Sequence, residues 1–264
     1  MKKIWMGIGV VCAVSLVSCG GGGTEAPKAD AGGGAAAPAA GGAGAVPDEA
    51  NGATITGKVM FDGTAPKEKT IDMSAVPACT RAHANAPAKS EEVIVNDNKT
   101  VKYAFVWIKS GLPEGTTWKV PSTPVMLDQN GCMYKPHVIG IMAGQNIEVK
   151  NSDPTNHNIH PSPTVNQEWN ESQPPGSEDK MKTFARQEVM IPVKCNVHNW
   201  MRSYIGVVSH PFFAVTGDDG SFTIKGLPPG TYTLEVWHEK YGTQDQTITV
   251  GAKESKTQDF TIKG

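Results

Sequence analysis

Short segments in which apolar and polar residues alternate run through this chain and end at turns that contain glycine or proline. Residues 53–61 alternate in this way and stop at Asp62-Gly63, and residues 232–236 follow the turn Leu227-Pro-Pro-Gly230. A period of two residues is typical of strands with one buried face. The chain of 264 residues also contains 29 glycines and 19 prolines. We therefore predict an all-β protein, built as a sandwich or barrel.

Further strands are expected in the apolar runs between these two segments. The run at 103–108 is apolar enough for a strand that is buried on both faces, and residues 188–194 form another apolar run. Residues 138–141 and 146–150 flank Ala143-Gly144, which predicts a hairpin.

The N-terminus has the layout of a secretory signal. Two lysines precede an apolar run from Ile4 to Val17, which is too short to span a bilayer. The run ends in Leu16-Val17-Ser18-Cys19, which resembles the lipobox read by bacterial signal peptidase II. The resemblance implies that residues 1–18 are removed as a signal peptide and that Cys19 is lipidated.

The next segment, residues 19–51, consists almost entirely of glycine, alanine, proline and a few charged residues. It has too little apolar surface to fold, so we expect a flexible tether. Gly20 beside the lipidated cysteine favours the outer membrane. These features predict an extracytoplasmic, lipid-anchored protein in the outer membrane that faces the periplasm or the cell surface.

The charge of the chain argues against nucleic acid as a partner, because a net charge of −2 gives no basic excess. No run of 18 or more apolar residues follows the signal, so the sequence predicts no further membrane segment.

The five cysteines have different expected fates. Cys12 leaves with the signal and Cys19 is lipidated, so three remain in an oxidising compartment. Two of the three can pair, while the third can bind a metal. Cys195 is the one with metal-ligand neighbours, so we predict a disulfide between Cys79 and Cys132.

A zinc site is the alternative for these two cysteines. His83 lies four residues after Cys79, and His137 lies five residues after Cys132. The four side chains could form a Cys₂His₂ zinc site. In a secreted chain, the disulfide is the favoured interpretation.

The segment Cys195-Asn-Val-His198-Asn-Trp-Met201 carries the clearest metal-binding signal. A thiolate, an imidazole and a thioether at spacings of three can all be directed at one point by a single loop. One more imidazole would complete a plane of two histidines and one cysteine with a weak axial methionine, which is the blue-copper arrangement. The loop therefore predicts one mononuclear copper site.

The segment from Tyr134 to Val208 resembles the cupredoxin family, and amicyanin most closely. The matching residues are Met133-Tyr-Lys-Pro136, Ala143-Gly-Gln-Asn-Ile-Glu-Val-Lys-Asn151, His157-Asn158-Ile159, and Cys195, His198, Met201 and Arg202 in the ligand loop.

This resemblance implies a Greek-key β-sandwich and supplies the second imidazole. A histidine followed by asparagine is the upstream ligand of the family, which implies His157 as ligand and Asn158 as a residue that braces the copper loop. His160 is the alternative ligand, but on a regular strand it would point to the opposite face.

The resemblance also implies that the ring edge of His198 is exposed and passes electrons. Trp200 is then either a docking aromatic or a lid over the copper. Pro192-Val-Lys194 before the ligand cysteine and the long polar connection from Pro161 to Lys182 depart from the family pattern.

The flanks resemble carboxypeptidase regulatory-like domains, which are transthyretin-like β-sandwiches close to starch-binding-like folds. Gly57-Lys-Val-Met-Phe-Asp-Gly63 and the segment 219–236 carry this resemblance. It implies that residues 52–124 and 211–264 form one sandwich, with a cupredoxin domain at 125–210 inserted in it or fused to it.

The sequence therefore favours a membrane-tethered type 1 copper protein that transfers single electrons, with a redox protein as partner. Copper carriage or buffering in the envelope is one alternative. A non-redox module that binds a glycan, peptidoglycan or a protein is the other. An enzyme is not expected, because Cys195 and His198 lack an evident orienting acid and a saturated copper site has no open coordination position.

Overall fold

The computed structural model describes residues 44–264. The predicted signal at 1–18, Cys19 and most of the tether lie outside the described residues. Within 44–264 the chain forms seventeen strands and one short helix, which confirms the prediction of an all-β protein. This part of the chain contains no helix with the length and apolar character needed to cross a membrane.

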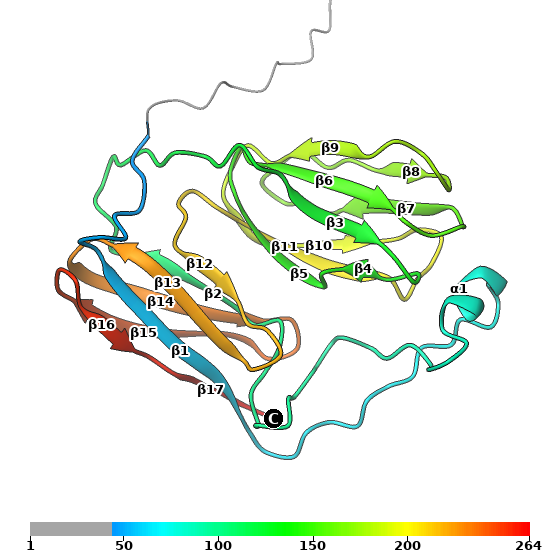
Figure 1. The fold of residues 1–264 in the computed structure, drawn as a ribbon, viewed down its shortest axis with the longest axis horizontal. Helices are drawn as coiled ribbons and strands as arrows, with labels where there is room; N and C mark the ends of the chain where they lie inside the picture. The colour runs from blue at the N-terminus through cyan, green and yellow to red at the C-terminus, as the bar shows by residue number, and fades with distance from the viewer. Residues whose placement is uncertain (1–43) are drawn as a thin grey trace, which may run out of the picture. The chain divides into compact units, whose positions relative to one another are not determined.

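The first sandwich is built from strands near both ends of the described chain (Figure 1). One sheet has the order β13-β1-β16, with β17 also paired to β1, and the other has the order β12-β2-β14-β15. The bounds are β1 Ala53–Asp62, β2 Phe105–Ser110, β12 Phe213–Val215, β13 Ser221–Leu227, β14 Gly230–His238, β15 Gly242–Val250, β16 Ser255–Thr257 and β17 Phe260–Lys263.

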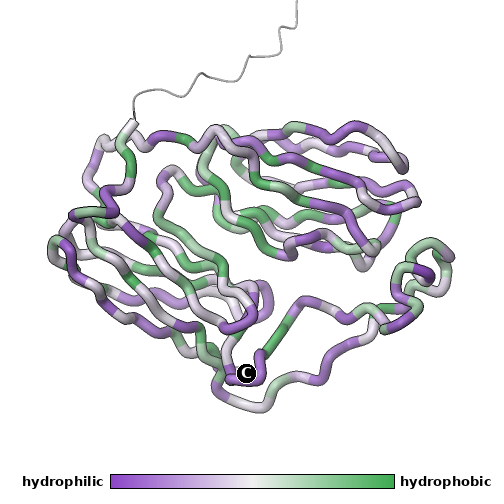
Figure 2. Tube along the Cα trace, in the orientation of Figure 1, coloured by the Kyte–Doolittle hydropathy of each residue, from purple (hydrophilic) through white to green (hydrophobic). Residues whose placement is uncertain are grey.

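The alternation seen in the sequence explains how these sheets pack. Ile55 and Val59 of β1 are fully buried, and Leu234 and Val236 of β14 join the same apolar cluster. The residues that alternate with the buried ones in β1 are more exposed, and apolar and polar colours alternate along the strands in Figure 2. Burying one apolar face of each sheet against the other is therefore what holds this sandwich together.

The second sandwich is formed by strands that are contiguous in the sequence. Its sheets have the orders β5-β11-β10-β7-β8 and β4-β3-β6-β9. The bounds are β3 Val125–Gln129, β4 Tyr134–Lys135, β5 Val138–Met142, β6 Asn146–Asn151, β7 His157–Pro161, β8 Glu171–Gln173, β9 Lys180–Thr183, β10 Glu188–Lys194 and β11 Arg202–Val208. The pairs β3–β6 and β5–β11 are parallel, and the other pairs are antiparallel.

The second sandwich interrupts the first in the sequence. Strands β2 and β12 are paired, with Trp107 opposite Phe213, although all of β3–β11 lies between them in the chain. The chain therefore leaves the first sandwich after β2 and returns to the neighbouring position in the same sheet.

The predicted hairpin at Ala143-Gly144 is wrong. Strand β5 pairs with β11 and strand β6 pairs with β3, so the turn joins two different sheets. The side-chain oxygen of Gln145 accepts the Met142 N–H at 3.0 Å. This N–H is therefore not available for a backbone hydrogen bond between the two strands of a hairpin. A short turn permits both arrangements, and the partner strands, distant in sequence, decide between them.

The connection from β1 to β2 contains the helix α1 (Pro77–Ala82), which the sequence pattern did not predict. Pro77 occupies the first turn, where a missing N–H costs nothing. Met73 and Ala88, on either side of the helix, are buried in the apolar cluster of the second sandwich. The connection is thus packed on the second sandwich although it belongs to the first in sequence.

Candidate metal centre

The loop 195–201 connects β10 to β11 and is closed by backbone hydrogen bonds. The Cys195 N–H donates to the Met201 carbonyl at 3.2 Å, and the Met201 N–H donates to the His198 carbonyl at 3.0 Å. Lys194 and Arg202 face each other as the last pair of the β10–β11 ladder. This tight closure brings Cys195, His198 and Met201 to one end of the sandwich.

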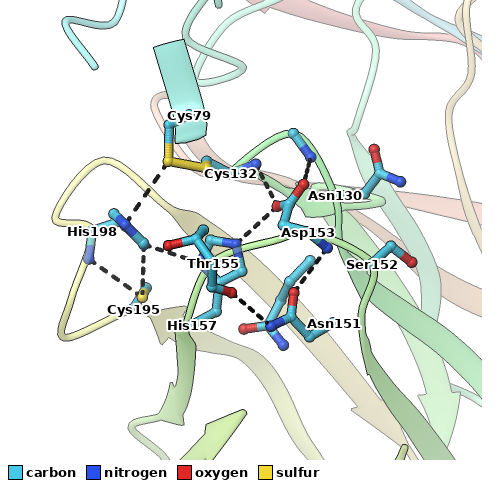
Figure 3. Close-up of polar contacts among 12 residues, drawn as sticks. Cys79, Asn130, Cys132, Asn151, Ser152, Asp153, Thr155, His157, Cys195 and His198 are labelled. Atoms are coloured by element: carbon cyan, nitrogen blue, oxygen red, sulfur yellow. Dashed lines mark hydrogen bonds and ion pairs between the residues drawn. A yellow bond between two sulfur atoms is a disulfide. The ribbon is translucent and has the colours of Figure 1, made fainter. Parts of the chain in front are cut away.

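His157 reaches the same place from the start of β7. Strand β7 pairs with β10, with His160 opposite Lys194, so the chain before His160 runs alongside the ligand loop. The Nδ1 atoms of His157 and His198 are 3.0 Å apart, and the Sγ of Cys195 is 3.8 Å from the Nδ1 of His198 (Figure 3). All three potential ligand atoms lie within 4.8 Å of one another, and all three residues are buried.

Met201 ends the loop and is fully buried. It belongs to the same apolar cluster as Cys195. The structure therefore brings three of the four predicted ligands together by their donor atoms and keeps the fourth in the adjoining core.

The environment of Cys195 favours the thiolate. Burial opposes ionisation, but contacts with His157 and the N–H of His198 outweigh it, so that the pKa of the thiol lies below its ordinary value. The His198 N–H donates to the Cys195 sulfur at 3.3 Å. A thiolate is the form of cysteine that binds a metal.

The two imidazoles differ in their surroundings. Burial lowers the pKa of His198. Burial also opposes the charged form of His157, but the Asp153 carboxylate beside it raises the pKa above its ordinary value.

Asp153 is a candidate site residue that the sequence analysis missed. Its carboxylate lies 2.8 Å from the Nε2 of His157 and accepts the backbone N–H groups of Gly131 and Cys132, each at 2.7 Å. A hydrogen bond at Nε2 leaves the Nδ1 of His157 free to bind a metal. The available signal was an acidic residue four positions before the predicted ligand.

Asn158 contacts the ligand loop as the resemblance implied. Its side-chain oxygen accepts the Asn196 N–H at 3.1 Å, and its side-chain nitrogen donates to Asn170 and to the Glu171 carbonyl. This side chain therefore ties β7, the ligand loop and β8 together.

His160 does not join the converging group. Its Nδ1 lies 3.2 Å from the side-chain oxygen of Asn196, and its Nε2 contacts Glu168. It supports the loop from outside the site.

Cys79 and Cys132 are joined by a disulfide. The other two members of the alternative zinc site lie elsewhere, because His83 contacts the Gly131 carbonyl and His137 contacts Glu239. Among the described residues these four side chains do not form a metal-binding group.

The expectation of an exposed His198 edge is wrong. His198 is only 1% exposed, because the Sγ of Cys79 lies 3.9 Å from its Nε2. The Trp200 ring packs against the imidazole, with centroids 5.1 Å apart, and its Nε1–H donates to the Cys132 carbonyl at 3.0 Å. The helix α1 and its disulfide thus cover the ring edge that the family resemblance left open.

The donor set fits copper. Two imidazole nitrogens and one thiolate converge in a buried site, with a thioether residue in the adjoining core. This combination suits both Cu(I) and Cu(II). The contact of the His157 Nε2 with Asp153 leaves the Nδ1 of His157 facing the Cys195 sulfur and the His198 ring.

Comparison with known proteins gives one family match and several similar structures. Residues 207–263 match the family model of the carboxypeptidase regulatory-like domain. The comparison with curated proteins gives no match.

The similar structures include a copper-containing nitrite reductase and amicyanin. The Cu-containing nitrite reductase from Thermus scotoductus SA-01 shares 20% identity at a TM-score of 0.29, over 37% of this chain and 25% of that chain. Amicyanin from Paracoccus versutus shares 18% identity at a TM-score of 0.29, over 39% of this chain and 96% of that chain. A Cu(I) form of a mutant amicyanin shares 19% identity at a TM-score of 0.28.

This chain thus spans about a quarter of the nitrite reductase and nearly all of amicyanin. Its own strand order and ligand loop, together with the family match, confirm the fold that the sequence predicted. The chain is an all-β protein of two β-sandwiches, and residues 207–263 match the family model of the carboxypeptidase regulatory-like domain.

Proposed function

We propose that this protein binds one copper ion through His157, Cys195, His198 and Met201 and transfers single electrons between redox partners. The observation that carries this proposal is the convergence of three buried donor atoms within 4.8 Å of one another. Copper held there would supply a one-electron couple between Cu(II) and Cu(I).

The residues of the site favour electron transfer because they hold one geometry. Asp153 fixes the ring of His157, and Asn158 ties the ligand loop to β7. Burial of all three donor residues excludes water. Ligands that are fixed by surrounding residues would move little when copper gains or loses an electron. The reorganisation energy would therefore be small.

The protein acts outside the cytoplasm in this proposal. The lipobox-like sequence at Cys19 and the tether that follows support attachment to the outer membrane. A redox protein would be the partner, and a flexible tether would let the folded part reach it.

A role in catalysis is not proposed. Four protein ligands would complete the copper site and leave no coordination position for a substrate. The site would then act by outer-sphere transfer alone.

Copper titration followed by visible spectroscopy tests the proposal. We expect an intense blue colour, because the Cys195 thiolate would donate charge to Cu(II). Cys195→Ser should abolish the colour, since a hydroxyl is neither soft nor readily ionised, and His157→Ala should alter or abolish it.

His160→Ala is the matched control, because His160 lies on the same strand and contacts Asn196 outside the donor group. It should leave the colour nearly unchanged. A colourless wild-type protein would contradict the copper proposal. Rapid loss of Cu(I) to a chelator would instead favour copper carriage.

A further inference from the structure

The covered edge of His198 leaves the site without the direct surface contact expected for electron exchange. The Cys79 sulfur lies against the Nε2 of this histidine, and both residues are buried. A partner that approaches here would meet α1 and the disulfide. Electrons would therefore have to enter through another residue that contacts a candidate ligand and is itself exposed at the surface.

Trp200 meets this requirement. Its ring packs on the His198 imidazole with centroids 5.1 Å apart and planes at 43°. The hydrogen bond from its Nε1–H to the Cys132 carbonyl fixes the ring in this position. Unlike His198, Trp200 is only partly buried. It is thus an aromatic group with one side on a candidate ligand and another toward solvent.

A cavity of about 510 Å³ lies beside Trp200. This volume falls within the range of small-molecule sites. Tyr204 and Ile71 contribute aromatic and apolar wall, and Asp72 and Glu91 contribute carboxylates. The cavity therefore offers flat apolar surface for a ring and acceptor oxygens at its margin.

The carboxylates indicate the chemistry of an occupant. Glu92 is paired with Lys69, and Glu239 contacts His137. Asp72 accepts the Ser74 N–H at 2.9 Å, and the Oε1 of Glu91 accepts the Tyr103 hydroxyl at 3.2 Å. The Oε2 of Glu91 lies 3.8 Å from the Nδ1 of His137 but is buried without a hydrogen-bond partner in the described part of the chain. An ionised carboxylate only accepts hydrogen bonds, so it would bind a ligand that carries hydrogen-bond donors, of which O–H groups are one kind.

We propose that Trp200 carries electrons to the copper site and that the cavity binds a small aromatic reductant with hydroxyl groups, of the hydroquinone class. This inference rests on the proposed copper function. The inference goes beyond the proposed function because it names the route of the electrons and the electron donor.

Each transfer would move one electron and one proton. One O–H bond of the bound hydroquinone breaks, and its proton passes to a cavity carboxylate and then to water. The electron passes through Trp200 and His198 and reduces Cu(II) to Cu(I), which leaves a phenoxyl radical. Once the redox protein partner has taken the electron from Cu(I) and restored Cu(II), a second such step removes the remaining hydroxyl proton and one more electron, and yields the quinone.

Stopped-flow reduction of the Cu(II)-loaded full-length protein by hydroquinone tests the route. The rate should saturate with hydroquinone concentration in the wild type. Trp200→Leu should lower it at least tenfold without changing the visible spectrum or the reduction potential. Trp200→Phe keeps an aromatic face and should give an intermediate rate, and it provides the test if the leucine variant loses copper.

Trp169→Leu is the matched control. Trp169 is a partly buried tryptophan of the same sandwich, but it packs on Phe184. Its replacement should leave the rate within twofold of the wild type. Equal rates for wild type and Trp200→Leu would overturn the route.

Binding to the copper-free protein gives a readout that does not depend on electron transfer. Calorimetry should detect hydroquinone binding, and Glu91→Gln should weaken it at least threefold. Glu68→Gln, at an exposed glutamate outside the cavity, should not change it. Absence of hydroquinone binding to the wild type would overturn the assignment of the cavity. A wild type that takes up no copper would instead overturn the proposed function.

Discussion

The two candidate imidazole ligands are each contacted at their outer nitrogen by a group outside the predicted ligand set. Asp153 faces the Nε2 of His157, and the disulfide sulfur of Cys79 faces the Nε2 of His198. The Cys132 N–H in turn donates to Asp153, so the two contacts are linked through the disulfide. Both rings are thereby held with Nδ1 toward the centre.

Asp153→Asn should weaken copper binding. The carboxylate serves His157 and two backbone N–H groups, whereas an amide has one acceptor oxygen. Loss of such a partner lowers metal affinity about 10- to 100-fold, and competition with a copper chelator would measure it. Asp128→Asn is the control, because Asp128 accepts a hydrogen bond from Ser152 instead. Equal affinities for both variants would show that Asp153 does not position His157.

Met201→Leu should leave the protein blue and raise its reduction potential. The thioether is the weak ligand of the predicted set, and leucine has a similar apolar volume, so packing should change little. Cu(II) would lose a donor, which favours Cu(I). Voltammetry of both proteins measures the change. An unchanged potential would mean that Met201 does not face the metal.

Sequence reasoning reached the donor residues but not their supports. Cys195, His198 and Met201 share one short loop, so their spacing alone predicts that they meet. The contacts of Asp153 depend on the conformation of Gly131 and Cys132, more than twenty residues away in sequence. The covered edge of His198 likewise depends on α1, which no local pattern connects to the ligand loop.

Among the elements, α1 shows how a minor segment can determine access to a site. The helix has six residues and no side-chain cap. It is held by its disulfide, by the buried Met73 before it and by the contact between His83 and the Gly131 carbonyl. Its position follows from these tertiary contacts, since a helix this short is not stable alone.

Replacing Cys79 and Cys132 together with alanine should destabilise the protein and uncover His198. The two cysteines are 53 residues apart, and closing a loop of this size contributes about 4 kcal/mol in the chain-entropy model. Denaturant unfolding measures the loss. Chemical modification of His198 by diethyl pyrocarbonate in the copper-free protein should become faster. An unchanged modification rate would mean that other contacts keep the helix in place.

The wrong hairpin prediction shows that local sequence patterns locate strands but do not identify the strands with which they pair. The strands on either side of Ala143-Gly144 were recognised within one or two residues. Their partners were not, because pairing with β11 and β3 depends on residues far along the chain.

For the molecule as a whole, two buried histidines of the first sandwich should make folding sensitive to acid. Burial lowers the pKa of both His210 and His238 to about 4. His210 is fixed in a neutral form, donating to the Ile108 carbonyl through Nε2 and accepting the Phe212 N–H at Nδ1. The unfolded chain would protonate both histidines near pH 6.5.

The free energy of unfolding should therefore fall as the pH drops from about 6.5 to about 4. The loss is about 1.4 kcal/mol per pH unit for each histidine, because below pH 6.5 the unfolded state binds protons that the folded state does not. Denaturant titrations of the copper-free protein at several pH values measure the slope. The double variant His210→Gln and His238→Gln should flatten it, and an unchanged slope would assign the acid sensitivity to other groups.

The strands that pair with β1 are among the last to be synthesised. Its ladder partners β13, β16 and β17 all come from residues 221–263, whereas β3–β11 pair among themselves. As the chain emerges during synthesis, the edges of β1 would stay unpaired while the second sandwich can already close. Unpaired edges invite aggregation, and such distant pairing is slow. Production of this protein should thus be limited by how well its first strand is shielded until its last residues have been synthesised.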